Sequence, residues 1–306
     1  MNFIPQNIRV RDPFILAENG LYYLYASAAL REGSGFLGVE VYTSADLRNW
    51  SAPKPVLTLP PDSAVTDVWA PEVHACNGAY YMFVTFTFNE LLSEHKPVDA
   101  PDWPELKRRG TWVLRADSPN GAFTKLRDAS HTPESWMALD GTLFVEDETP
   151  HMVFCHEWIQ LVDGSMDVVR LSSDLSDTIS EPLELFKAGS AMRDKTNVLD
   201  RKVTDGPFLY RSQRTQRLFM IWSTFVPGHR YCVLQTRSTT GRIAGPWSAH
   251  EPLYMGNGGH GMLFNDFEGR LLLSLHQPNT EPLERLRLFE LCEDDAGLRV
   301  VAEVAL

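Results

Sequence analysis

Five positions along the chain place a charged or polar residue beside Pro or Gly at the start of an apolar run. They are Asp12, Glu72, Asp140, Asp205 and His260. Carboxylates gathered in one concave site resist simultaneous ionisation, so their pKa values separate. One carboxyl can then stay protonated as a general acid while another stays ionised to activate water, as in glycosidases. The residue types suit acid–base hydrolysis if the fold brings these positions together.

These residues begin five copies of one sequence pattern, which consists of a polar residue, an apolar strand, a turn and a second apolar strand. Successive leading residues are 60, 68, 65 and 55 positions apart, which leaves room for four short strands per copy. Turn dipeptides such as Asn19-Gly20 and Asn77-Gly78 are typical of hairpins, and long amphipathic helices are absent. A β-sandwich would not explain the near-constant interval. The repeat predicts an all-β, five-bladed β-propeller with four antiparallel strands per blade.

We expect residues 1–306 to form a single propeller domain. The blade cores are predicted near 8–50, 68–127, 138–187, 203–250 and 257–304. The irregular stretch from Asn89 to Gly110 interrupts the second copy and contains several Pro and basic residues. Insertions of this length often form functional rims, so we expect this segment to border the site.

In a propeller the first strand of each blade lines the central channel, and the second strand returns to the same mouth. Glu157 follows the second strand of the third copy, so it is expected beside Asp140. Polar and aromatic groups that belong to the same mouth are candidates for contacts with sugar hydroxyls and ring faces. The candidates for binding substrate are Trp69, Glu72, Trp158, Phe225 and His276. An ordinary turn or core position remains the alternative for each of them.

Taken together, the motifs resemble those of glycoside hydrolase family 43, which includes arabinofuranosidases, xylosidases and arabinanases. The resemblance runs through all five copies and rests on Arg11-Asp12-Pro13, Trp69-Ala70-Pro71-Glu72, Leu139-Asp140-Gly141, Asp205-Gly206-Pro207-Phe208 and Gly259-His260-Gly261. It implies a five-bladed propeller that removes terminal arabinose- or xylose-type residues from plant-type oligosaccharides with inversion. It also implies that Asp12 is the general base and Asp140 the auxiliary carboxylate that tunes the acid.

Two further roles follow from the resemblance. His260 matches a hub histidine that in some members holds a calcium ion largely through water. No cofactor is expected to be required. We expect the His260 ring to lie at the hub near a calcium or other ion or an ordered water cluster, and a hydrogen-bonded core histidine is the alternative. The family's general acid is normally a glutamate in the fourth blade, where this chain has Asp205. An aspartate is one methylene shorter. Either Asp205 donates the proton from a shifted position, or Glu157 has taken the role, and its longer reach slightly favours Glu157.

The composition argues against several classes of partner. The net charge of -12 disfavours nucleic acid and anionic membrane surfaces.

The N-terminal residues carry no basic run followed by an apolar stretch, which predicts a cytoplasmic protein. Its cysteines are far apart and are expected to be reduced core thiols: Cys76, Cys155, Cys232 and Cys292.

Two other functions fit the same architecture. A propeller phosphorylase would need a basic pocket for phosphate, for which Arg230 and Arg237 are the candidates, although no basic cluster converges on the hub motifs. A sugar-binding propeller that has lost its acid would explain the aspartate at position 205. Dependence of turnover on phosphate would identify the first, and binding of an oligosaccharide without release of monosaccharide the second.

Overall fold

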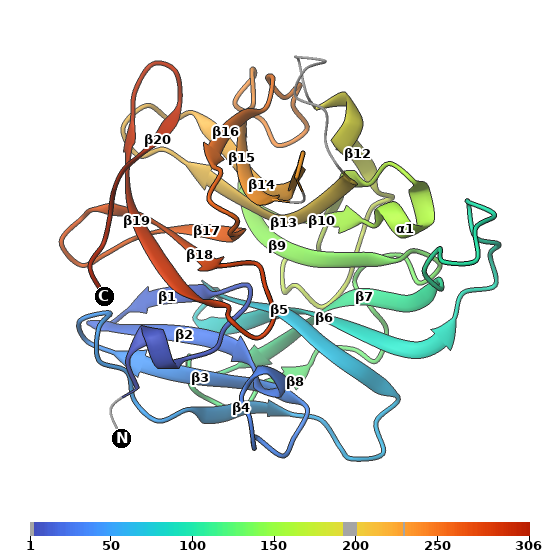
Figure 1. The fold of residues 1–306 in the computed structure, drawn as a ribbon, viewed down its shortest axis with the longest axis horizontal. Coiled ribbons are helices and arrows are strands. Elements are labelled where there is room, and N and C mark those ends of the chain that lie inside the picture. The colour runs from blue at the N-terminus through green and yellow to red at the C-terminus, as the bar shows by residue number, and fades with distance from the viewer. Residues whose placement is uncertain (1–2, 192–200, 229) are drawn as a thin grey trace.

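The computed structural model describes residues 3–191, 201–228 and 230–306. It contains five sheets, each made of four strands that are consecutive in sequence and antiparallel to their neighbours. Figure 1 shows the sheets arranged around a centre, with the first strands β1, β5, β9, β13 and β17 innermost. The predicted all-β, five-bladed propeller is therefore confirmed.

Blade one consists of β1 (Phe14–Glu18), β2 (Leu21–Ser27), β3 (Gly38–Ser44) and β4 (Lys54–Thr58). Blade two consists of β5 (Val65–Cys76), β6 (Ala79–Leu91), β7 (Lys107–Ala116) and β8 (Thr124–Lys125). Blade three consists of β9 (Ala138–Glu146), β10 (Thr149–His156), β11 (Ser165–Arg170) and β12 (Leu183–Lys187). Blade four consists of β13 (Arg201–Arg211), β14 (Leu218–Val226), β15 (Arg230–Arg237) and β16 (Glu251–Tyr254). Blade five consists of β17 (Gly259–Asn265), β18 (Leu271–Gln277), β19 (Arg285–Glu293) and β20 (Leu298–Glu303).

The expected limits of the blades need one clear correction. Blade one was expected to end near residue 50, yet its outermost strand β4 runs to Thr58. Trp50, which looked like the end of the blade, pairs instead with Phe3 of the N-terminal segment. Smaller shifts occur elsewhere: β5 begins at Val65, β13 at Arg201, and β16 ends at Tyr254. Outer strands carry weaker apolar patterns because one edge faces solvent, so sequence locates them least well.

The inner hairpins follow directly from their turn residues. Asn19 and Gly20 both have positive φ, at 50° and 77°, and Asn77 and Gly78 repeat this with 49° and 75°. Two successive left-handed residues make the tight turn whose twist matches that of paired strands. The turns bring β1 against β2 and β5 against β6, so the ends of the second strands return to the mouth from which the first strands start.

The ring closes where the N-terminal segment lies against blade five. Val10 donates its backbone N–H to the carbonyl of Glu284, and Arg9 pairs with Arg285 in an isolated bridge. The Glu284 carboxylate is fully buried and accepts from Arg9 at 3.2 Å and from Arg11 at 3.1 Å. Since Asp12 follows directly, this closure also holds the start of blade one in place.

Packing between blades forms the apolar core, with Trp112, Trp222, Phe83 and Phe154 among its largest fully buried side chains. Cys155 and Cys232 are buried, Cys76 and Cys292 half-buried, and all four are free thiols, as expected from their spacing. Within the described residues, no helix is long and apolar enough to cross a membrane.

The insertion in blade two spans the connection from β6 to β7. Trp103 packs edge-on against Trp158, with ring centroids 5.2 Å apart, and its indole N–H donates to the carbonyl of Ile159 at 2.9 Å. Both partners lie in α1 (Trp158–Leu161), the short helix that follows β10. The insertion therefore supports a blade-three segment that borders the pocket described below.

Candidate active site

A residue in the left-handed backbone conformation, termed the bulge residue of its blade, recurs at or just before the first strand of every blade. The residues Asp12, Ala70, Asp140, Gly206 and His260 all have φ between 45° and 57°, a left-handed conformation that is uncommon outside glycine. In blades two to five the pairing of the first two strands also shifts register at this point. A bulge re-aims the side chains around it, so the positions at and next to it decide what faces the mouth.

The bulge corrects the alignment of the five sequence copies. Asp12, Asp140 and His260 occupy equivalent bulge positions, but blade two has Ala70 there and blade four has Gly206. Glu72 lies two residues past its bulge, where it is buried and bonds His74 Nε2 at 3.0 Å. It does not line the pocket, so the expected role of Glu72 at the mouth is wrong. Asp205 precedes its bulge by one residue and still reaches the site.

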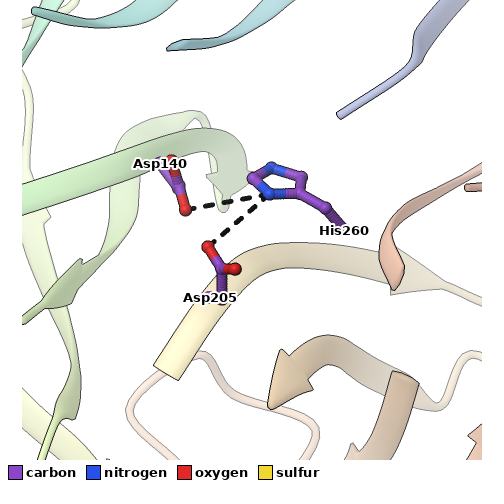
Figure 2. Close-up of side chains that lie close together, drawn as sticks. All are labelled: Asp140, Asp205 and His260. Carbon is purple, nitrogen blue, oxygen red and sulfur yellow. Dashed lines mark ion pairs between the residues drawn. The ribbon is translucent and has the colours of Figure 1, made fainter. Parts of the chain in front are cut away.

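His260 is the centre of the cluster. Its Nδ1 lies 3.2 Å from Asp12 Oδ1, 3.6 Å from Asp205 Oδ1 and 3.9 Å from Asp140 Oδ2. Figure 2 shows this nitrogen directed at Asp140 and Asp205. Burial by itself would lower the histidine pKa, but the three carboxylates outweigh it and raise the pKa to about 10. At neutral pH the site therefore contains an imidazolium that links the first strands of blades one, three, four and five.

The pKa values of Asp140 and Asp205 are shifted in opposite directions. Asp140 is almost fully buried, and burial raises its pKa well above the ordinary value. Burial acts on Asp205 in the same direction, yet bonds from His260, Asp140 and Tyr231 overcome it and hold the Asp205 pKa below its usual range. The Gly206 N–H donates to Asp140 Oδ2 at 3.2 Å, and the Asp140 N–H donates to Thr85 Oγ1 at 2.9 Å. The pair thus shares a proton that resides on Asp140.

Close approach around His260 requires glycine in blade four. A Cβ placed on Gly206 would meet ring carbons of His260 at 2.7 and 2.8 Å, closer than real side chains allow. Gly206 also has a φ of 47°. The Asp205-Gly206 dipeptide therefore serves the site directly, because any side chain at position 206 would push the imidazole away from the carboxylates.

Glu157 lies at the pocket in a different environment. It follows β10 and forms a direct ion pair with Arg109 Nη1, and both side chains are largely buried. Arg109 also donates to Thr87 Oγ1 at 2.9 Å and lies over the Trp69 ring, 4.3 Å from its centroid. Burial raises the pKa of Glu157, whereas the Arg109 charge opposes that shift. The structure thus brings Glu157 to the same pocket as Asp140 but holds it in a separate ion pair.

A cavity of about 550 Å³ opens over the cluster. It contains most of the residues expected from the sequence: Asp12, Trp69, Asp140, Glu157, Trp158, Asp205, Phe225 and His260. His276 does not line it, because the ring is completely buried and accepts the backbone N–H of Asp12 through Nδ1 at 3.2 Å. His276 was expected to contact sugar; its burial makes that expectation wrong.

Sequence reasoning missed several residues of the pocket and its support. Asp67 and Arg201 line the cavity, and Arg109 and Tyr231 contact its carboxylates. Arg109 belongs to the basic run at residues 107–109, and a charged residue directly before an apolar strand pattern was a weak signal that could have identified it. Tyr231 gave no such signal, because an aromatic residue at the start of a strand is ordinary.

Comparison with known proteins identifies the family. The family model described as glycosyl hydrolases family 43 matches residues 5–290. The chain belongs to glycosyl hydrolases family 43. The predicted resemblance is confirmed, and with it the assignment of the chain as a glycoside hydrolase. Because the match extends from blade one into blade five, it includes all five of the repeated motifs.

Three similar proteins are informative. The family 43 chain is similar to an endo-arabinase from Bacteroides thetaiotaomicron VPI-5482, with 34% identity and a TM-score of 0.80 over 95% of this chain and 97% of that one. It is also 25% identical over 264 residues to an extracellular exo-alpha-(1->5)-L-arabinofuranosidase of Streptomyces chartreusis, covering 80% of this chain and 70% of the relative. An alpha-L-arabinofuranosidase from Lactobacillus brevis shares the fold, with a TM-score of 0.74 and 16% identity over 97% of this chain and 96% of that one.

The cytoplasmic location expected from the N-terminal residues is wrong. The Streptomyces relative is an extracellular enzyme, which contradicts the expectation of a cytoplasmic protein. The N-terminal residues were a poor basis for the expectation, since a targeting segment is a separate stretch from the domain that folds.

The hub of the family 43 chain offers ligand atoms for a cation. Asp140, Asp205 and His260 each present one donor atom, and these atoms lie within 4.8 Å of one another. Calcium takes six to eight oxygen ligands, so water or substrate would have to complete its coordination. The Nδ1 atom that faces the carboxylates carries a proton when His260 is charged and is then unable to bind a metal. A hub ion held through His260 therefore stays a prediction, and its site competes with the ion pairs seen here.

Proposed function

We propose that the protein hydrolyses α-L-arabinofuranosyl linkages of plant-type arabino-oligosaccharides with inversion of configuration. The observation that carries the proposal is the convergence of Asp12, Asp140 and Asp205 on the His260 ring in one cavity. The arabinose preference rests on the relatives: the 34% identical structure is an endo-arabinase, and the curated relative is an exo-acting arabinofuranosidase. Xylose-type substrates stay the second choice.

Asp12 is the proposed general base. Its carboxylate oxygen Oδ1 lies 3.2 Å from Nδ1 of His260, and the residue lines the cavity where water and substrate would meet. An ionised carboxylate at this place can accept a proton from the attacking water. Its backbone N–H donates to His276 Nδ1 at 3.2 Å, which anchors the backbone that carries this carboxylate.

Asp205 is the proposed general acid, with Asp140 as the carboxyl that holds the shared proton. The alternative, Glu157, would have to be protonated to donate, and protonation would leave Arg109 as a buried and unpaired charge. Breaking a buried ion pair in this way is costly. Asp205 would take its proton from Asp140 inside the same cluster, a transfer that runs against the pKa order of the two carboxyls but leaves no buried charge without a partner. The preference for Glu157 that its reach suggested is therefore reversed.

Spacing between the proposed base and acid bears on the stereochemistry. Inverting glycosidases separate their carboxyls by roughly 6.5 to 9.5 Å and retaining enzymes by about 5 Å. Asp12 Oδ1 and Asp205 Oδ1 lie 3.2 and 3.6 Å from the same atom, Nδ1 of His260. The distance between these two oxygens therefore cannot exceed the sum of the two values. That limit reaches the lower end of the inverting range. Inversion then requires the water to approach from the cavity side of Asp12.

Phosphorolysis is less well supported. Arg230 and Arg237 do not line the cavity. Arg9, Arg11 and Arg201 do. Arg9 and Arg11 are already paired with the buried Glu284, and Arg201 lies over the Phe225 ring. Two of the three arginines are thus neutralised, which offers little to a phosphate dianion.

Hydrolysis of nitrophenyl α-L-arabinofuranoside, β-D-xyloside and β-D-galactoside tests the substrate class, and arabino-oligosaccharides test the natural linkage. We expect the arabinofuranoside to be the best of the three, and the first anomer detected by NMR during arabino-oligosaccharide hydrolysis to be inverted. Turnover that rises with added phosphate would indicate phosphorolysis. Binding of arabino-oligosaccharide without any released sugar would indicate a non-catalytic binder.

A further inference from the structure

Tyr231 connects the proposed acid to the opposite side of the site. It lies in β15, the third strand of blade four, and its hydroxyl contacts Asp205 Oδ2. The other carboxylate oxygen, Oδ1, faces His260. With a partner on each oxygen, the Asp205 carboxyl cannot rotate without losing one of them. The restrained residue, Asp205, is one methylene shorter than the glutamate that is usual at this position in the family.

His276 holds the proposed base in a similar way. Its Nδ1 accepts the Asp12 N–H, and its Nε2 lies 3.1 Å from Asn279 Oδ1. Because Nδ1 accepts, Nε2 carries the ring hydrogen and donates it to Asn279. Burial lowers the pKa of His276 to about 4, so the ring is neutral and this tautomer persists. The bond supports Asp12 in a backbone conformation with φ of 51° that a non-glycine residue adopts only when held.

The two aromatic side chains form one unit. The rings of Tyr231 and His276 stack with centroids 5.6 Å apart and planes 22° from parallel. Both are buried, at 1% and 0% exposure. Gly259 provides the space, since a Cβ there would meet Tyr231 Cε1 at 2.5 Å. A rigid stack therefore runs from the Asp205 carboxylate to the Asp12 backbone.

We propose that Tyr231 and His276 are positioning residues that together hold Asp205 and Asp12 at a fixed separation across the site. The inference rests on the proposed function, because it takes Asp205 as the acid and Asp12 as the base. The stack would set the gap that the attacking water and the scissile bond must occupy. Errors of about an ångström in such a gap are known to reduce turnover strongly.

Removing the Tyr231 hydroxyl separates positioning from packing. Tyr231→Phe keeps the ring and its stack but frees Asp205 Oδ2. We expect kcat on an arabino-oligosaccharide to fall roughly ten- to a hundredfold with KM nearly unchanged, as for a lost bond to a charged group. On nitrophenyl arabinofuranoside, whose leaving group departs with little protonation, the fall should stay within about threefold.

Substitution of His276 should give the complementary kinetic pattern, with equal losses on the two substrates. His276→Phe keeps an aromatic ring but removes the acceptor for the Asp12 N–H. Because the base is needed for every substrate, kcat should fall by a similar factor on both. His276→Gln retains an acceptor oxygen and should recover part of the loss, which keeps the test informative if the Phe variant folds poorly.

Tyr25→Phe is the matched control. Tyr25 is fully buried in blade one and donates its hydroxyl to the carbonyl of Pro119 at 2.6 Å, away from the cavity. Its loss should change the melting temperature and leave kcat on both substrates unaltered. A Tyr231→Phe variant that behaves like this control would overturn the inference, as would equal losses on both substrates.

Asp205→Asn, measured beside these variants, distinguishes the two levels of proposal. If it shows no selective loss on the oligosaccharide, the assignment of the acid fails, and the proposed function must be revised. If Asp205→Asn shows the selective loss and Tyr231→Phe does not, only the positioning role fails. The Tyr231→Phe/Asp205→Asn double variant should resemble Asp205→Asn alone, since residues that act through one another are not additive.

Discussion

Nδ1 of His260 lies 3.2 Å from Oδ1 of Asp12, so the imidazolium contacts the proposed base as well as the two carboxyls that share a proton. The charge of one cation is thus distributed over three acids from three blades. Asp140, the most buried of the three, has a pKa raised well above its ordinary value within this cluster.

Asp12→Asn should lower kcat by a factor on the order of 10² to 10⁴ on every glycoside tested, because no carboxylate would remain to accept the water's proton. The measurement is steady-state kinetics with circular dichroism to show that the fold persists. Activity within a few fold of the unmodified enzyme would remove Asp12 from the mechanism.

Asp205→Asn and Glu157→Gln should differ in their dependence on the leaving group. A sugar alkoxide needs a proton to depart and an activated phenolate does not, so loss of the acid hurts the oligosaccharide selectively. We expect that pattern for Asp205→Asn.

Glu157→Gln should instead affect both substrates, since it leaves the Arg109 guanidinium buried without its partner beside Trp69. A selective loss in Glu157→Gln would assign the acid to blade three. If neither variant shows selectivity, Glu72 is the next carboxyl to replace, although its position outside the cavity argues against it.

The stability of the hub should depend on pH in a defined direction. The pKa of His260 is raised from 6.5 to about 10, so its contribution to the free energy of unfolding is fully present below pH 6.5. It is lost as the pH rises through about 10. Denaturant unfolding of the unmodified protein and His260→Gln should therefore show a difference that shrinks across this window. A difference that grows with pH would mean that His260 is neutral in the folded protein.

Removal of metal ions should leave most of the activity intact. The His260 imidazolium already neutralises part of the carboxylate charge that a hub cation would neutralise. After dialysis against EDTA we expect kcat on nitrophenyl arabinofuranoside to remain within a few fold. Loss of activity that calcium restores would instead show that an ion replaces the ion pairs at His260.

Repetition made the fold readable from the sequence. The Asn-Gly turns, the short apolar strands and the five repeated patterns each reflect local physics, so they predicted the blade count and the strands. The order of the motifs placed Asp12, Asp140, Asp205 and His260 at one mouth, because in a propeller every first strand starts at the same channel. Trp69, Trp158 and Phe225 reached the cavity for the same reason.

Only the tertiary structure decided which residue of each repeated pattern faces the site. A bulge inserts residues into one strand and turns its side chains, and its exact position is not visible in the spacing of the motifs. The sequence pattern therefore aligned Glu72 with Asp12, whereas the residue of blade two that is equivalent to Asp12 is Ala70. The contacts of Glu157 with Arg109 and of Tyr231 with Asp205 and His276 join segments that are 48, 26 and 45 residues apart. Such contacts depend on how whole blades pack, because each partner alone is an ordinary strand or turn residue.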